Sequence, residues 1–234
     1  MDRVVRVWDA ANGKEMLALR GHRRSVSALI FSRDGKRLVS ATGGITRRFS
    51  PDLDNPLKLN SDDPKEVPDV KLWDVATGKQ LQSLSFPGKG PGLALSSDGE
   101  TLAVSFGEAG VFIQRTINFP GGATVNTVVL AAANPGVVRL YRVATGQEIA
   151  TLQGHTRPPW CVGFSPDGQR VVTGGGADQT VKLWNAATGE EIITVGRHLA
   201  GSVTSVGFSP DGQKIISTSD RESVRVWDAT PVKK

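Results

Sequence analysis

One five-residue motif, repeated along the 234-residue chain, constrains its fold more than any other feature. Phe164-Ser165-Pro166-Asp167-Gly168 recurs as Phe208-Ser209-Pro210-Asp211-Gly212, and weaker copies begin at Phe31 and Leu95. Downstream of each copy lies a short apolar segment that ends in an aromatic residue, in turn Trp73, Tyr141, Trp184 and Trp227. The last three of these aromatic residues follow one another at intervals of 43 residues. A fixed period of this size indicates an array of one small folding unit.

The sequence within each unit predicts four short β-strands, here named a to d in chain order. The Asp-Gly pair that ends the motif predicts a tight turn between strands a and b, because glycine accepts a positive φ. Thr-Gly pairs predict a similar turn between c and d, at Thr77-Gly78, Thr145-Gly146 and Thr188-Gly189. The 27 glycines and 13 prolines are scattered along the chain, which argues against long helices. A single four-stranded sheet cannot bury both faces, so the units must stack on one another.

Gly21-His22 and Gly154-His155 open two of the units, and Trp73-Asp74 and Trp227-Asp228 close two. With these dipeptides, the units resemble the WD40 repeat family, in which Gly-His and Trp-Asp bracket about 40–45 residues. The resemblance implies an all-β propeller of about four blades plus a partial one. We expect a partial repeat of strands c and d at 1–22, repeats at 23–86, 87–154 and 155–197, and a last repeat without strand d at 198–234.

The resemblance also implies a hydrogen-bonded set of side chains that is structural in each blade. The repeat at 155–197 has all four members, His155, Thr173, Asp178 and Trp184. A buried indole, imidazole and hydroxyl need partners, and an aspartate can anchor them. The same residue types could form a nucleophile group, but the structural role explains them fully.

The other repeats keep fewer members of this set. The repeat at 23–86 has His22, Ser40 and Trp73, but an insertion replaces the turn that would carry the aspartate. The last repeat keeps Ser217 and Trp227, while Arg221 stands where the aspartate is expected and His198 is one residue too far from Phe208. The repeat at 87–154 has Phe86, Val104 and Tyr141 in these places, so we expect apolar packing to hold it.

Two insertions, at 43–68 and 107–136, lie between strands b and c of adjacent repeats. In the WD40 family the b–c and d–a loops share one face of the propeller, so both insertions are expected on that face. We expect the first to be a solvated loop and the second to form a hairpin that extends b and c, with an apolar stripe that packs on the propeller or contacts a partner. Trp160 stands where the family has a small residue. The candidate contacts for a protein partner are Trp160, Arg157, Arg23, Arg24, Phe112, Ile117 and Phe119.

The expected strands do not complete a ring, since the last repeat stops after strand c and the chain begins with only c and d. Three outcomes remain open: a piece of a larger propeller, two chains joined in an eight-bladed ring, or four blades that close alone. We favour an open arc, with dimerisation as the means of covering its apolar ends.

The leading functional hypothesis is a non-enzymatic scaffold that holds protein partners, because nothing in the sequence supplies a metal cluster or paired catalytic carboxylates. The alternative is an enzyme with a site in the central channel, or a sensor segment of a larger signalling enzyme. The net charge of +5 is spread along the chain, which does not indicate a nucleic-acid surface. The single cysteine, Cys161, excludes an internal disulfide and a Cys-based zinc site, and we expect no cofactor. Without a membrane-length apolar stretch or a secretory signal at its start, we expect a cytoplasmic protein.

Overall fold

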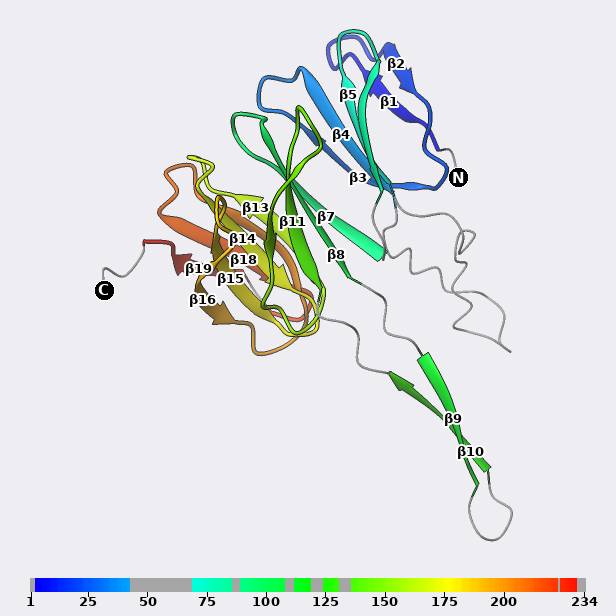
Figure 1. Cartoon of the computed structure of the whole chain (residues 1–234), viewed down its shortest axis with the longest axis vertical. Coiled ribbons are helices and arrows are strands. Elements are labelled where there is room, and N and C mark those ends of the chain that lie inside the picture. The colour runs from blue at the N-terminus through cyan, green and yellow to red at the C-terminus, as the bar shows by residue number, and fades with distance from the viewer. Residues whose placement is uncertain are drawn as a thin grey trace.

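The computed structural model describes residues 3–42, 69–85, 89–107, 112–118, 124–130, 136–222 and 224–230. Within these residues the regular structure is entirely antiparallel β-sheet, without a helix. Figure 1 shows the sheets stacked side by side in an open arc, with the first and the last described strands at opposite ends of the stack. The all-β fold and the incomplete propeller expected from the sequence are therefore confirmed.

Five sheets form the arc, and we number them as blades in chain order. The first blade has two strands, β1 (Val5–Trp8) and β2 (Glu15–Leu19), which correspond to c and d. The second blade has four: β3 (Val26–Phe31), β4 (Arg37–Thr42), β5 (Asp69–Asp74) and β6 (Gln80–Ser85). The third blade has β7 (Lys89–Leu95), β8 (Thr101–Gly107), β11 (Val137–Arg142) and β12 (Glu148–Leu152).

The fourth blade is a complete sheet of β13 (Pro159–Phe164), β14 (Arg170–Gly175), β15 (Thr180–Asn185) and β16 (Glu191–Arg197). The fifth blade has three strands, β17 (Val203–Phe208), β18 (Lys214–Ser219) and β19 (Arg225–Asp228), which correspond to a, b and c. The strand order in each sheet follows the chain, as successive hairpins require.

The second insertion contains a hairpin of β9 (Phe112–Asn118) and β10 (Thr124–Leu130), paired from Phe112 with Leu130 to Asn118 with Thr124. These two strands form a sheet of their own instead of lengthening β8 and β11, which differs from the expected continuation of strands b and c. Figure 1 shows the hairpin standing away from the blades. The first insertion, at 43–68, lies outside the described residues.

A small hydrogen-bond network in the repeated motif explains why each a–b turn has the same shape. In the fourth blade the Ser165 hydroxyl donates to Asp167 Oδ1 at 2.5 Å and accepts the Arg170 N–H at 2.9 Å. Asp167 Oδ1 also accepts the Gln169 N–H, and Gly168 has the positive φ of 71° that the turn requires. The same serine–aspartate bond recurs in the turns of the other motif copies, at Ser32, Ser96 and Ser209.

The core consists of apolar layers between successive blades. Val39 and Leu72 of the second blade pack against Leu102, Val104 and Tyr141 of the third. Equivalent layers join the third blade to the fourth and the fourth to the fifth, and β1 and β2 cover part of the second blade around Leu38 and Trp73. The blades are thus held by burial of the faces that meet between neighbours, as stacked repeats require.

Candidate functional site

The fourth blade brings together the four polar side chains that the sequence singles out there. His155 Nε2 lies 2.6 Å from Thr173 Oγ1, and His155 Nδ1 lies 2.8 Å from Asp178 Oδ2. The Trp184 indole N–H donates to the same threonine hydroxyl at 2.8 Å. All four side chains are buried. With Nδ1–H donated to the carboxylate, Nε2 is the acceptor for the hydroxyl proton, so the set is satisfied internally.

The second blade has the same set, and its acidic member is one that the sequence analysis missed. His22 Nε2 lies 2.6 Å from Ser40 Oγ, which also accepts the Trp73 indole N–H at 2.7 Å. Asp69, the first residue of β5, places Oδ1 2.8 Å from His22 Nδ1. The insertion therefore does not remove the acidic residue, because strand c itself supplies it. An aspartate at the start of an apolar strand was the available signal.

The fifth blade also completes its set, which corrects two expectations. His198 reaches Ser217 Oγ at 2.8 Å, although its spacing suggested that it was one residue too far away. The d–a loop absorbs the extra residue, with Gly201 in a positive-φ conformation. Glu222, not Arg221, supplies the acid, with Oε2 2.9 Å from His198 Nδ1. Trp227 donates its indole N–H to Ser217 Oγ at 2.8 Å.

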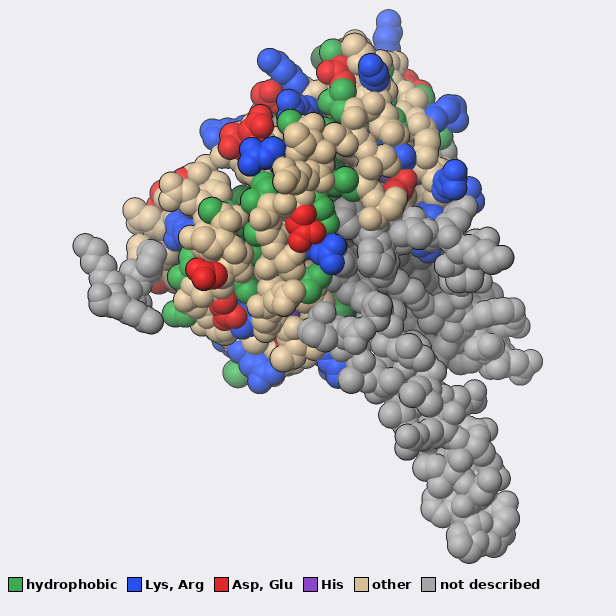
Figure 2. Space-filling view, in the orientation of Figure 1, with side chains coloured by type: hydrophobic (Ala, Val, Ile, Leu, Met, Phe, Trp, Pro, Cys, Tyr) green, Lys and Arg blue, Asp and Glu red, His purple; other side chains and the backbone are tan. Residues whose placement is uncertain are grey.

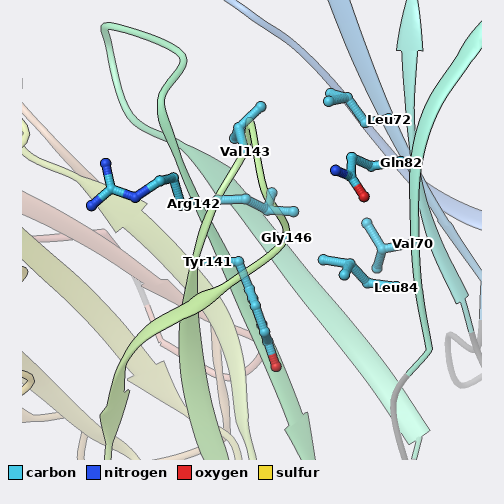
Figure 3. Close-up of a pocket in the computed structure, with 9 residues that line it drawn as sticks. Val70, Leu72, Gln82, Leu84, Tyr141, Arg142, Val143 and Gly146 are labelled. Atoms are coloured by element: carbon cyan, nitrogen blue, oxygen red, sulfur yellow. The ribbon is translucent and has the colours of Figure 1, made fainter.

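The third blade has Val104 and Tyr141 at the hydroxyl and indole positions, and apolar packing surrounds them. A small cavity of about 20 Å³ lies beside Tyr141, between the second and third blades. Figure 3 shows Tyr141 on one side of it and Val70, Leu72 and Leu84 on the other. A space of this size holds about one water molecule, so it cannot admit a substrate. Burial raises the pKa of Tyr141 above its ordinary value, which keeps the phenol neutral.

The buried sets contain a hydroxyl, a histidine and a carboxylate, which invites comparison with a nucleophile group. Ser40, Thr173 and Ser217 are fully buried, and each hydroxyl already accepts an indole N–H. A nucleophile must instead reach its substrate. Burial alone would raise the pKa of Asp178, but hydrogen bonds from His155 and Thr180 hold it below the ordinary aspartate value. The carboxylate is therefore the charged anchor of a structural set.

Trp160 is the most distinctive of the partner candidates. It is the extra residue of a β-bulge in β13, between Pro159 and Cys161, where β3 and β17 have Ser27 and Thr204. A bulge turns a side chain out of the ladder, and Trp160 keeps 39% of its surface exposed. Its indole lies against the b–c turn, since a Cβ on Gly176 would come within 2.7 Å of Nε1.

The other partner candidates lie on d–a loops or in the second insertion. Arg23 and Arg24 are in the d–a loop that leads into the second blade, and Arg157 is in the one that leads into the fourth. Leu199, which the sequence analysis did not single out, is 81% exposed in the d–a loop of the fifth blade. Phe112 and Ile117 are on β9, and Phe119 lies outside the described residues.

The described residues offer neither a metal-binding group nor a membrane-spanning helix. No group of three His, Cys, Asp or Glu side chains there could hold a metal ion, and no helix is long and apolar enough to cross a bilayer. Cys161 is packed between the fourth and fifth blades, and burial raises the pKa of its thiol to about 12. In the view of Figure 2, Lys and Arg side chains are scattered among Asp and Glu instead of forming one patch.

Comparison with known families agrees with this geometry. Residues 13–47, 146–185 and 189–228 match the family model described as "WD domain, G-beta repeat". The chain carries WD40 repeats. Between the first two matches lie three strands of the third blade, β7, β8 and β11, which have Val104 and Tyr141 at the hydroxyl and indole positions of the set.

Several curated proteins are similar in sequence to this chain. The chain is 28% identical over 210 residues to serine-threonine kinase receptor-associated protein of Bos taurus, covering 74% of this chain and 58% of that protein. The Dictyostelium discoideum protein of the same name is 28% identical over 211 residues, covering 74% of this chain and 70% of that protein. Human pre-mRNA-processing factor 17 is 34% identical over 107 residues, covering 45% of this chain and 18% of that protein. The chain thus spans little more than half the length of the mammalian relatives in the first group.

Proposed function

We propose that this WD40-repeat chain is a non-enzymatic scaffold that holds a protein partner on the face formed by its b–c and d–a loops. The observation that carries the proposal is Trp160, a large aromatic side chain that a bulge exposes where the equivalent strands have Ser27 and Thr204. Tryptophan and arginine are the residues most often responsible for binding energy at protein interfaces. Arg157 lies three residues before Trp160, in the same loop and strand start.

The chemistry of these loops favours a partner segment with both acidic and apolar residues. Arg23, Arg24 and Arg157 supply positive charge, and Leu199 adds an exposed apolar side chain. An acidic segment would pair with the arginines, while an apolar residue would pack on the indole. We propose this face for the partner because the a–b turns, at the other end of the strands, are occupied by the serine–aspartate hydrogen bonds.

The relatives support a scaffold more than any one pathway. Their names associate one group with a serine-threonine kinase receptor and another with pre-mRNA processing. These roles differ, so what the relatives share with this chain is the repeat architecture that presents a binding face. The alternative of a channel enzyme or a sensor segment lacks a comparable observation, because Asp69, Asp178 and Glu222 already bind the histidines of their own blades.

The test is a selection of displayed random peptides on the immobilised chain. We expect enrichment of acidic peptides that contain an aromatic or aliphatic residue, with binding lost in Trp160→Ala and weakened in Arg157→Glu. Leu81→Ala is the matched control, because Leu81 is a similarly exposed apolar residue on the outer strand β6. Peptides that bind the Trp160 variant as well as the wild type would contradict the proposed site.

A further inference from the structure

The C-terminal end of the arc exposes a sheet face that every earlier blade buries. Val224 and Val226 are equivalent in register to Val181 and Leu183 of the fourth blade, because each pair precedes the strand-c tryptophan by three and one residues. Val181 is fully buried, whereas Val224 is 59% exposed. Ile216 on β18 is likewise exposed, while its counterpart Val172 is buried. This face is the one that, in the other blades, packs against the next blade.

The N-terminal end exposes the complementary face. Leu29 and Phe31 on β3 are equivalent to Leu93 and Leu95 on β7, since each pair lies opposite the same two positions of strand b. Leu93 and Leu95 pack in the layer between the second and third blades, but Leu29 is 55% exposed. The cause is that the first blade has strands c and d, and no described strand occupies the a and b positions beside them.

The two ends carry the same strand c. Residues 5–10 and residues 224–229 are both Val-Arg-Val-Trp-Asp-Ala. β1 has an outer neighbour, β2, and its inner edge carries no other described strand; β19 has an inner neighbour, β18, and its outer edge carries none. The first blade therefore has strands c and d without a described a and b, while the fifth blade has a, b and c without a described d. β1 could replace β19 residue for residue against β18.

We propose that a second copy of this chain completes the arc through a shared blade, built from β17 and β18 of one copy and β1 and β2 of the other. β19 gives up its place to the identical strand β1, which brings strand d with it. The exchange breaks one antiparallel pairing, β18 with β19, and forms an equivalent one. It is a strand swap of the kind that produces closed dimers from identical elements.

The exchange replaces contacts at little cost and adds new burial. Trp8, which is 55% exposed, takes the position in which Trp227 donates to Ser217, beside His198. Val224 and Val226 are already exposed, so release of β19 uncovers chiefly Trp227 and Ala229, whose places Trp8 and Ala10 take. In return, Ile216 of one copy covers Leu29 and Phe31 of the other, as Val172 packs with Val206 and Phe208 inside the chain. Burial of this apolar surface is favourable.

Two reciprocal exchanges give a closed pair with eight four-stranded blades, in which neither end of either arc remains open. Open sheet edges and apolar faces favour uncontrolled association, and closure removes both. The occupant of the exposed faces is thus a second copy because each copy offers both halves of the missing blade.

The first test compares two tryptophan variants by light scattering and thermal unfolding. We expect the wild type to have about twice the single-chain mass of 24.9 kDa. Trp8→Ala should weaken the dimer by about tenfold or more, whereas Trp227→Ala should leave its mass unchanged. A wild type of single-chain mass at all concentrations, or a dimer that depends on Trp227 and not on Trp8, would overturn the proposal.

The second test exchanges charges across the new contact. Leu29→Glu and Ile216→Lys should each abolish dimers when measured alone, because each homodimer would bury two unpaired charges. Mixing the two variants should restore a dimer, since one shared blade then pairs Lys with Glu and the other is unchanged. Leu81→Lys should remain dimeric as the control. Failure of the mixture to restore the dimer, or an Leu29→Glu variant that dimerises normally, would show that the two ends do not meet.

Discussion

Asp69 and His22 are 47 positions apart in the sequence, and yet their Oδ1 and Nδ1 atoms lie 2.8 Å from each other. The contact spans the whole insertion at 43–68 and ties the start of strand c to the d–a loop of the same blade. With Ser40 and Trp73, it rebuilds the hydrogen-bonded set that the fourth blade forms with Asp178 in its b–c turn. The position of the acidic residue therefore varies while its contact with histidine is kept.

Removal of this aspartate should destabilise the chain. Asp69→Ala leaves the Nδ1 of the buried His22 without its partner, and we expect the free energy of unfolding to fall by about 1–3 kcal/mol. Asp178→Ala should have a similar effect for the same reason. Urea unfolding followed by tryptophan fluorescence measures both. An Asp69 variant as stable as the wild type would show that the insertion has left the second blade without a functional acidic member.

The fifth blade offers a matched pair of adjacent residues. Glu222→Ala should lower the free energy of unfolding measurably, because Glu222 contacts His198 and also accepts the Leu199 and Ala200 backbone N–H groups. Arg221→Ala should change it by less than about 0.5 kcal/mol, since Arg221 is an exposed side chain. The same urea titration compares the two. Equal losses of stability, or a larger loss for the Arg221 variant, would contradict the assignment of Glu222 as the acidic partner of His198.

Acid should weaken the fold through the same carboxylates. Burial opposes ionisation of Asp69, Asp178 and Glu222, but hydrogen bonds from the histidines hold their pKa values below the ordinary 3.8 for Asp and 4.5 for Glu. A carboxyl whose pKa is lower in the folded state stabilises the fold above its unfolded pKa, and this contribution disappears as pH falls through the folded value. Stability from these groups should therefore hold down to about pH 5 and decline below about pH 4. Urea titrations at several pH values measure it, and Asp178→Asn should have a shallower decline than the wild type.

The third blade should accept a restored set only when two residues change together. Val104→Ser alone buries a hydroxyl among apolar side chains, which we expect to cost about 1–3 kcal/mol. Adding Tyr141→Trp places an indole N–H where it can donate to that hydroxyl and fills part of the adjoining cavity. A double-mutant cycle measures the coupling, which should be favourable. Additive losses would mean that the two positions do not meet as they do in the other blades.

Much of this architecture could be predicted from local sequence. The serine–aspartate turn needs only residues 165–170 and their copies, so each motif defines its own hairpin and strand register. The bulge that exposes Trp160 and the register of β9 with β10 are less local, because they depend on pairing between strands. Asp69 and Glu222 could not be assigned by spacing, since the number of residues between strand b and the acidic residue differs between blades. Histidine in a set tolerates such shifts as long as the carboxylate reaches Nδ1.

The most direct test of the whole account is hydrogen exchange at the indole N–H groups, followed by NMR. Buried tryptophans donate to hydroxyls inside the stacked blades, Trp73 to Ser40 and Trp184 to Thr173. We predict slow exchange for these two indoles, close to the rate set by global unfolding, and fast exchange for the exposed Trp160. Exchange of Trp73 and Trp184 as fast as that of Trp160 would contradict the stacked-blade structure.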